Sequence, residues 1–258
     1  MSSPSHGSII VFVALNLLAS GIVLAAHAAP AKNIVLVHGA FVDGSGWRPV
    51  YDILTKDGYN VSIVQPPLTG LEEDVAAVAR ILKRQDGPTV LVGHSYGGAV
   101  ITEAGVDPHV VALVYIAAHA PDVGETQTEN GKLFPSAGRT AIRVTEDGYA
   151  FLDMARFPAE FAADLPKEQA EFEANAQGLT AAAAFSTPIK NAAWKSKPSW
   201  YMIPASDHII DPDLERMYAK RANSVTIEIE GASHSVYASH PKEVAKLIED
   251  AAQKAKTD

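Results

Sequence analysis

The sequence predicts a three-layer α/β sandwich: a mostly parallel sheet of about six strands, with a helical cap inserted between two of them. Short apolar runs alternate with helix-like segments along most of the chain, the order expected of a sheet with helices on both faces. The runs are continuously apolar, which is typical of strands buried on both faces of a parallel sheet. One long segment, at about 121–197, breaks the alternation and contains no clear strand.

Six apolar runs are predicted to form the strands of this sheet. They are NIVLVH from Asn33, NVSIV from Asn60, TVLVG from Thr89, VVALVYIA from Val110, SWYMIPA from Ser199 and SVTIEIE from Ser224. Between and after them lie helical patterns. LEEDVAAVARILKR has apolar residues at helical spacing, acids in its first turn and bases in its last. PKEVAKLIEDAAQKAK begins at Pro241, and proline suits a first helical turn.

The segment at about 121–197 is predicted to form the helical cap. It contains FLDMARFPAEFAADLPKEQAEFEANAQGLTAAAAF, which is rich in alanine and phenylalanine and interrupted by prolines. An insertion that follows one inner strand and precedes the next is expected to lie over the carboxyl edge of the sheet, where pockets form in such folds.

The N-terminus differs from the rest of the chain. The apolar run IIVFVALNLLASGIVLAA ends at Ala26, the first residue of AHA at 26–28, and this arrangement resembles the core and cleavage site of a secretory signal peptide. We therefore expect a signal peptide at 1–28, a single domain at 29–258, and a periplasmic or secreted protein. MSSPSHGS carries no Lys or Arg and the run could span a membrane, so an uncleaved membrane anchor and a misassigned start are the alternatives.

Composition excludes some kinds of chemistry. The 258 residues include no cysteine, so disulfides, thiolate catalysis and cysteine metal sites are excluded. The formal net charge of −9 argues against nucleic acid or an anionic membrane as a partner. The histidines lack metal-ligand spacing and no phosphate-binding glycine loop is present, so we expect no metal and no cofactor.

The stretch Gly93-His94-Ser95-Tyr96-Gly97 stands between a predicted strand and a predicted helix. This is the G-x-S-x-G pattern in its proper context. A sharp strand-to-helix turn strains the serine backbone and crowds the flanking positions, so glycines there leave the hydroxyl exposed. The helix that follows directs its N-terminal amides and positive dipole at the same point. The alternative is an ordinary glycine-rich turn; the favoured interpretation is that Ser95 is a nucleophile.

A nucleophilic serine needs a base and an acid that orients the base. After a turn of this kind the acid and the histidine follow in that order along the chain. Asp207 follows one predicted strand and His234 follows the last one, so they are the expected catalytic acid and base. Asp211 and then Asp122 are the alternative acids. The competing histidines do not follow the final strand; they are His38, His94, His208 and His240. The backbone amides of Ala40 and Tyr96 are expected to form the oxyanion hole.

Together, IVLVHGAFVDGSGW, LVGHSYGGAVI, PSWYMIPASDHIIDP and GASHSVYASHPKEVAKLI resemble the α/β-hydrolase superfamily from about Lys32 to about Ala252. They are most similar to a branch with plant methylesterases, hydroxynitrile lyases and bacterial pyrethroid-hydrolase-like esterases. In the lyases a lysine lies two residues beyond the catalytic histidine and a threonine lies in the oxyanion loop. Here Val236 occupies the first position and the loop reads Gly39-Ala40-Phe41, so both departures favour hydrolysis.

The resemblance and the motifs imply a carboxylesterase-type serine hydrolase. It would cleave small hydrophobic esters through an acyl-enzyme, and its partner would be a small-molecule ester. The alternatives are cofactor-free lyase or perhydrolase chemistry at the same site, and a relative that binds a small ligand without turnover. The apolar cap is expected to favour hydrophobic esters over charged ones. The candidate pocket residues are Phe41, His119, Phe185 and Trp194.

Overall fold

The computed structural model describes Met1 and residues 30–255. The expected signal peptide at 1–28 therefore lies outside the described residues, Met1 apart, and stays a prediction. Within the described part of the chain, none of the helices is both long and apolar enough to cross a membrane.

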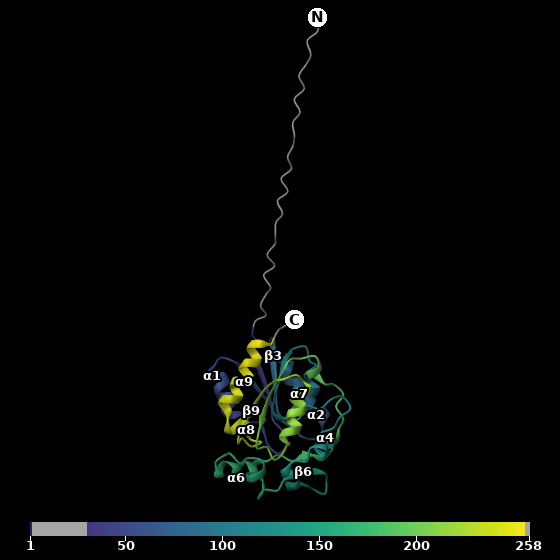
Figure 1. Cartoon of the computed structure of the whole chain (residues 1–258), viewed down its shortest axis with the longest axis vertical. Helices are drawn as coiled ribbons and strands as arrows, with labels where there is room; N and C mark the ends of the chain where they lie inside the picture. Colours follow the sequence, from purple (N-terminus) through teal and green to yellow (C-terminus); the bar gives the residue numbers. More distant parts are fainter. Residues whose placement is uncertain (2–29, 256–258) are drawn as a thin grey trace.

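A six-stranded parallel sheet forms the centre of the molecule (Figure 1), as the sequence predicted. Its spatial order is β2-β1-β3-β4-β8-β9. The strands are β1 (Asn33–Val37), β2 (Asn60–Val64), β3 (Thr89–Ser95), β4 (Val110–Ala118), β8 (Ser199–Pro204) and β9 (Val225–Ile229). Each neighbouring pair runs parallel, so all their carboxyl ends meet at one edge.

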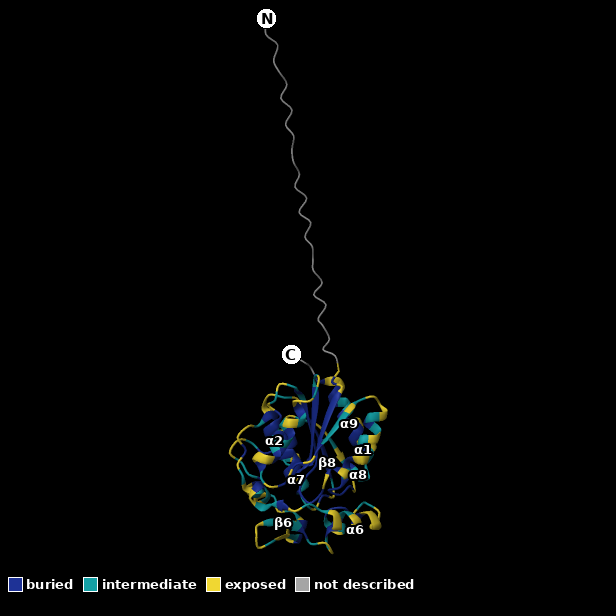
Figure 2. Ribbon diagram, turned by 180° about the vertical axis from the view of Figure 1, so that it is seen from behind, coloured by how far each residue is buried: buried dark blue, intermediate teal, exposed yellow. Residues whose placement is uncertain are grey.

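Two layers of helix cover the sheet. On one face lie α1 (Arg48–Lys56) and α9 (Pro241–Lys254), which pack against each other. On the other lie α2 (Leu71–Leu82), α3 (Tyr96–Ala104) and α7 (Pro212–Arg221), which contact the sheet or one another. Figure 1 shows α1 and α9 on one side of the strands, with α2 and α7 on the other. The central strands β1, β3, β4 and β8 are buried between them (Figure 2), whereas the edge strands β2 and β9 are partly exposed.

The alternating side chains of the central strands explain why their runs are continuously apolar. In β1, Ile34 and Leu36 join the core beneath α1 and α9, whereas Val35 and Val37 join the core beneath α2, α3 and α7. Successive side chains of a strand point to opposite faces. A strand with a helical layer on each face must therefore be apolar at every position.

The segment at 121–197 contains strands that the sequence analysis did not anticipate. A small antiparallel sheet has the order β5-β6-β7. Its strands are two to four residues long, and much of β5 is exposed, so they leave no long apolar run to detect. The elements of the segment are α4 (Gln127–Leu133), η2 (Ala137–Ala141), β5 (Ile142–Val144), β6 (Tyr149–Leu152), α5 (Phe157–Glu160), α6 (Lys167–Ala176), β7 (Thr180–Ala181), η3 (Ala182–Ser186) and η4 (Ala193–Lys195).

Three backbone hydrogen bonds join this segment to loops that follow strands of the main sheet. Ala181 N donates to Leu68 O over 2.8 Å, beyond β2. Gly138 N donates to His208 O over 2.6 Å, beyond β8, and Phe161 O accepts from Ser235 N over 3.0 Å, beyond β9. These loops all leave carboxyl ends, so the segment lies across that edge. Figure 1 shows its β6 and α6 beyond one end of the strands.

Candidate active site

Ser95 stands at the sharp turn between β3 and α3. Its backbone has φ 54° and ψ −124°, a conformation that costs free energy for a residue with a side chain. The turn is tight enough that a Cβ at Gly93 would lie 2.6 Å from Gly97 O. A Cβ at Gly97 would lie 2.7 Å from His38 O. Glycine is therefore required on both sides of the serine, which holds Ser95 at the carboxyl edge.

Asp207 and His234 form a buried pair on the loops after β8 and β9. Their atoms Oδ2 and Nδ1 are 2.6 Å apart. The other carboxylate oxygen, Asp207 Oδ1, accepts hydrogen bonds from the amides of Ile209 and Ile210, at 2.7 and 3.0 Å. A carboxylate can only accept, so Nδ1 of His234 carries a proton, and in the neutral ring this tautomer leaves the lone pair on Nε2. Within the described residues, Nε2 is buried and makes no hydrogen bond.

His94 connects the serine turn to the histidine loop. Its Nε2 donates to the carbonyl oxygen of His234 over 3.0 Å, and the two imidazole rings have centroids 4.8 Å apart. Burial, and next the neighbouring His234, hold the pKa of His94 well below its usual range, so its ring is neutral. The sequence interpretation had assigned His94 only to the turn motif.

Ser95 and His234 are thus brought to adjoining loops, but within the described residues no hydrogen bond joins Ser95 Oγ to His234. Such bonds are often long without substrate and tighten in the complex.

The two alternative acids have other partners. Asp211 Oδ1 accepts from the amide of Asp213 over 2.9 Å and caps α7. Asp122 forms an ion pair with Lys195 at 2.5 Å. Across the described ranges, neither carboxylate is within hydrogen-bond distance of His234, whose carboxylate contact is with Asp207. The remaining competing histidines also have their own contacts: His38 with Gly39, His208 with Glu160, and His240 with Ser239.

The amides of Ala40 and Tyr96 belong to residues that line the cavity containing Ser95. Among the backbone hydrogen bonds of loops, turns and caps in the described residues, neither amide is a donor, which is compatible with the predicted oxyanion hole. Hydrogen bonds to Asp74 fix the side chain of Tyr96. The Tyr96 hydroxyl donates to Asp74 Oδ2 over 2.6 Å, and Asp74 Oδ1 accepts from Leu68 N over 2.7 Å. Burial raises the pKa of Asp74, against the opposing effect of these hydrogen bonds.

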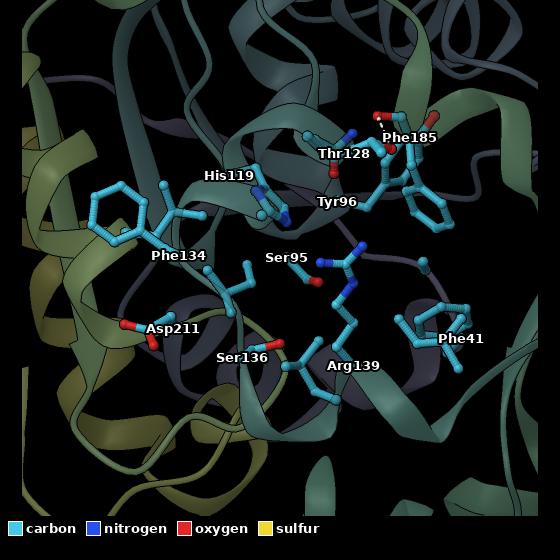
Figure 3. A pocket seen from close by; sticks show the side chains of 17 residues that line it. Phe41, Ser95, Tyr96, His119, Thr128, Phe134, Ser136, Arg139, Phe185 and Asp211 are labelled. Carbon is cyan, nitrogen blue, oxygen red and sulfur yellow. Dashed lines mark hydrogen bonds between the residues drawn. The ribbon is translucent and has the colours of Figure 1, made fainter.

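The cavity above Ser95 has a volume of about 170 Å³ and mostly apolar walls. Of the four pocket residues expected from sequence, Phe41, His119 and Phe185 line it. Figure 3 shows these three side chains around Ser95. Burial, and next His234, lower the pKa of His119 to about 3, so its ring is neutral at physiological pH. Trp194 is not among the lining residues: its Nε1 donates to Pro121 O over 3.0 Å, and its ring packs against Arg221.

Several lining residues were not foreseen from the sequence. The apolar ones are Phe134, Ile142, Ile209, Ile210 and Leu214; the polar ones are Gln127, Thr128, Ser136 and Arg139. Most belong to the segment at 121–197, whose short elements give no periodic signal that fixes which residues face inward. Among the described residues, no group of three or more His, Asp or Glu side chains is arranged to hold a metal ion.

The fold and this arrangement of side chains define a hydrolase of the α/β class. The sequence matches the alpha/beta hydrolase family over residues 34–247, and the chain belongs to that family. The alpha/beta hydrolase nvfD of Aspergillus novofumigatus is 28% identical over 244 residues, covering 86% of this chain and 97% of the relative.

Two further relatives and one solved structure have names that specify a substrate. The pyrethroid hydrolase of Sphingobium wenxiniae is 29% identical over 247 residues, covering 84% of this chain and 86% of the relative. The solved structure of a pyrethroid hydrolase matches with a TM-score of 0.73 and 25% identity, over 85% of this chain and 96% of that one. A carbendazim hydrolyzing esterase of Nocardioides sp. is 34% identical over 110 residues, 36% of this chain and 45% of the relative.

Proposed function

We propose that the protein is a serine esterase that hydrolyses small, largely apolar carboxylic esters by way of an acyl-enzyme. The observation that carries the proposal is the buried His234–Asp207 pair on loops that reach the serine turn through the hydrogen bond from His94, the neighbour of Ser95, to the His234 carbonyl. Nε2 of His234 is unpartnered among the described residues. Relatives named as a pyrethroid hydrolase and an esterase support an ester as the substrate.

In the first half of the reaction, Ser95 Oγ attacks the ester carbonyl carbon while His234 Nε2 takes the hydroxyl proton. The imidazolium that forms is stabilised by Asp207, which also keeps the ring in the required tautomer. The carbonyl oxygen becomes negatively charged and is bound by the amides of Ala40 and Tyr96. His234 then gives its proton to the leaving alkoxide as the bond between the carbonyl carbon and the alcohol oxygen breaks.

In the second half, a water molecule attacks the acyl-enzyme and His234 takes one of its protons. The tetrahedral intermediate uses the same two amides. Its collapse breaks the bond to Ser95 Oγ, which regains a proton from His234 and releases the carboxylic acid. The neutral, buried His94 behind His234 accepts no proton in this scheme and holds the loop through its hydrogen bond to the His234 carbonyl.

The experiment combines covalent labelling with turnover. A fluorophosphonate probe should label the wild-type protein at Ser95, and nitrophenyl esters should be hydrolysed. Ser95→Ala should lose the label and roughly a million-fold in kcat, as other triad serines do. Ser196→Ala is the control, because Ser196 is an exposed serine that does not line the cavity; it should keep both. Substantial esterase activity in Ser95→Ala would overturn the proposal.

A further inference from the structure

A single arginine lines the otherwise mostly apolar cavity. Among the lining residues of the described chain, Arg139 is the one with a permanent positive charge. Figure 3 shows its guanidinium pointing into the cavity toward Ser95. Arg139 is exposed in the structure, so its charge is hydrated there. A wholly apolar ester that covered the guanidinium would remove this hydration without replacing it, whereas an anionic group would replace it.

The backbone of Arg139 is held against the loop that carries the catalytic acid. The preceding residue, Gly138, donates its amide to His208 O over 2.6 Å. A Cβ at Gly138 would lie 2.7 Å from the same oxygen, so this approach requires glycine. At the other end of η2, Ala141 O accepts from Asp153 N over 2.9 Å. The arginine therefore projects from a fixed turn.

The carboxylates around Arg139 are engaged elsewhere. Asp153 pairs with Arg143 at 3.3 Å, and Glu160 pairs with Arg156 at 2.6 Å and with His208. Asp211, the one carboxylate that lines the cavity, caps α7. Within the described residues Arg139 forms no ion pair or side-chain hydrogen bond. Its five N–H donors are thus free for a ligand.

We infer that Arg139 selects esters that carry a carboxylate or a similar anionic group at one end of an otherwise apolar molecule. A guanidinium binds a carboxylate through two parallel hydrogen bonds, and the charge makes them stronger than neutral ones. The inference rests on the proposed esterase function. It revises the sequence expectation that the cap disfavours charged esters, since the apolar walls hold the body of the substrate and Arg139 binds its charged end.

The test compares matched pairs of esters with and without the charge. Monomethyl adipate is paired with methyl hexanoate, which places the anion on the acyl side of the ester. 4-Carboxyphenyl propanoate is paired with phenyl propanoate, which places it on the alcohol side. The wild type should favour one charged ester, and Arg139→Met should lower the charged-to-neutral ratio of kcat/KM about 10-fold. Arg139→Lys should keep part of this ratio because it keeps the positive charge. Added salt should lower the ratio in the wild type. Arg143→Met, an exposed arginine paired with Asp153, is the control and should change nothing.

A binding measurement separates this inference from the proposed function. The Ser95→Ala protein is titrated with adipic acid monoamide, which carries a carboxylate, and with hexanamide, which does not. Neither amide is one of the esters of the kinetic test. Tighter binding of the charged amide, lost in the Ser95→Ala, Arg139→Met double variant, supports the role of Arg139 even if no ester is hydrolysed. Equal binding of both amides, or an unchanged kcat/KM ratio in Arg139→Met, overturns it and leaves the esterase proposal standing.

Discussion

At the scale of single residues, two aspartates four positions apart have different roles. Asp207 is 4% exposed and both of its oxygens are used, one by His234 and the other by two amides. Asp211 caps a helix and borders the cavity. Both follow the same strand, so sequence position alone left Asp211 as an alternative; the hydrogen-bond partners separate them.

This difference predicts the effects of isosteric amide substitutions. Asp207→Asn should lower kcat by about 10⁴-fold, because the amide no longer holds His234 in the required tautomer. Asp211→Asn should change kcat no more than a few-fold, since asparagine caps helices as well as aspartate does. The measurement is kcat for a nitrophenyl ester in both variants, with Asp122→Asn alongside. Equal and mild losses at Asp207 and Asp211 would contradict the assignment of the acid.

At the scale of elements, the main sheet and the serine turn were predictable and much of the cap was not. The four central strands β1, β3, β4 and β8 are buried at almost every position, so their apolar runs are visible without any knowledge of their partners. The turn at Ser95 is equally local, since its glycines flank the serine. Arg139 could not be found in this way: it lines the cavity because Gly138 contacts His208, a residue on a distant loop, and its short 3-10 turn has no periodicity.

Another cross-element contact predicts how stability depends on pH. Glu125 accepts two hydrogen bonds from Arg221 of α7, at 2.6 and 2.9 Å, one from Asn130 of α4 and one from the Asp122 amide. Burial alone would raise the pKa of Glu125, but these hydrogen bonds outweigh it and lower the pKa to about 2. Since this pKa is depressed on folding, the stabilisation is present above the ordinary value of 4.5 and is lost as pH falls toward 2.

Glu125→Gln should therefore lower the free energy of unfolding by about 1–2 kcal/mol at pH 7, a figure reduced for the partial exposure of the pair. The gap between wild type and variant should shrink as pH is lowered from about 5 to about 3. Urea unfolding across this range measures it. Glu129→Gln, which removes an exposed pair with Lys132, should cost well under 1 kcal/mol. A gap that stays constant with pH would show that charge is not the cause.

At the scale of the whole molecule, the segment at 121–197 forms one wall of the cavity, and Ser95, Asp207 and His234 lie at or beyond the carboxyl ends of strands of the main sheet. Phe185 packs against Phe41 and Tyr96, with ring centroids 6.0 and 5.7 Å apart, so it joins the segment to the two loops that are proposed to form the oxyanion hole. Trp194 belongs to the same segment but lies outside the cavity. We expect the first residue to affect selectivity and the second to affect only packing.

Phe185→Ala should therefore change the ranking of nitrophenyl esters of increasing acyl length, because it enlarges the cavity beside Ser95. Trp194→Phe keeps most of the packing and removes the hydrogen bond to Pro121 O, so it should cost about 1 kcal/mol of stability and leave the ranking unchanged. The measurement is kcat/KM across the series, with fluorophosphonate labelling of Ser95 to show that the triad is intact. An unchanged ranking in Phe185→Ala would limit its role to packing.

The three backbone hydrogen bonds between the cap segment and the strand-end loops also limit how the protein can diversify. The loops beyond β8 and β9 that receive the cap are those that carry Asp207 and His234. A cap grafted from another enzyme would have to present its own amide to His208 and its own carbonyl to Ser235, or the acid and histidine loops would lose a partner. The segment that lines the cavity and the loops that carry the proposed catalytic acid and base therefore depend on one another in this chain. We expect single substitutions inside the cavity to change the substrate with less damage than exchange of the cap.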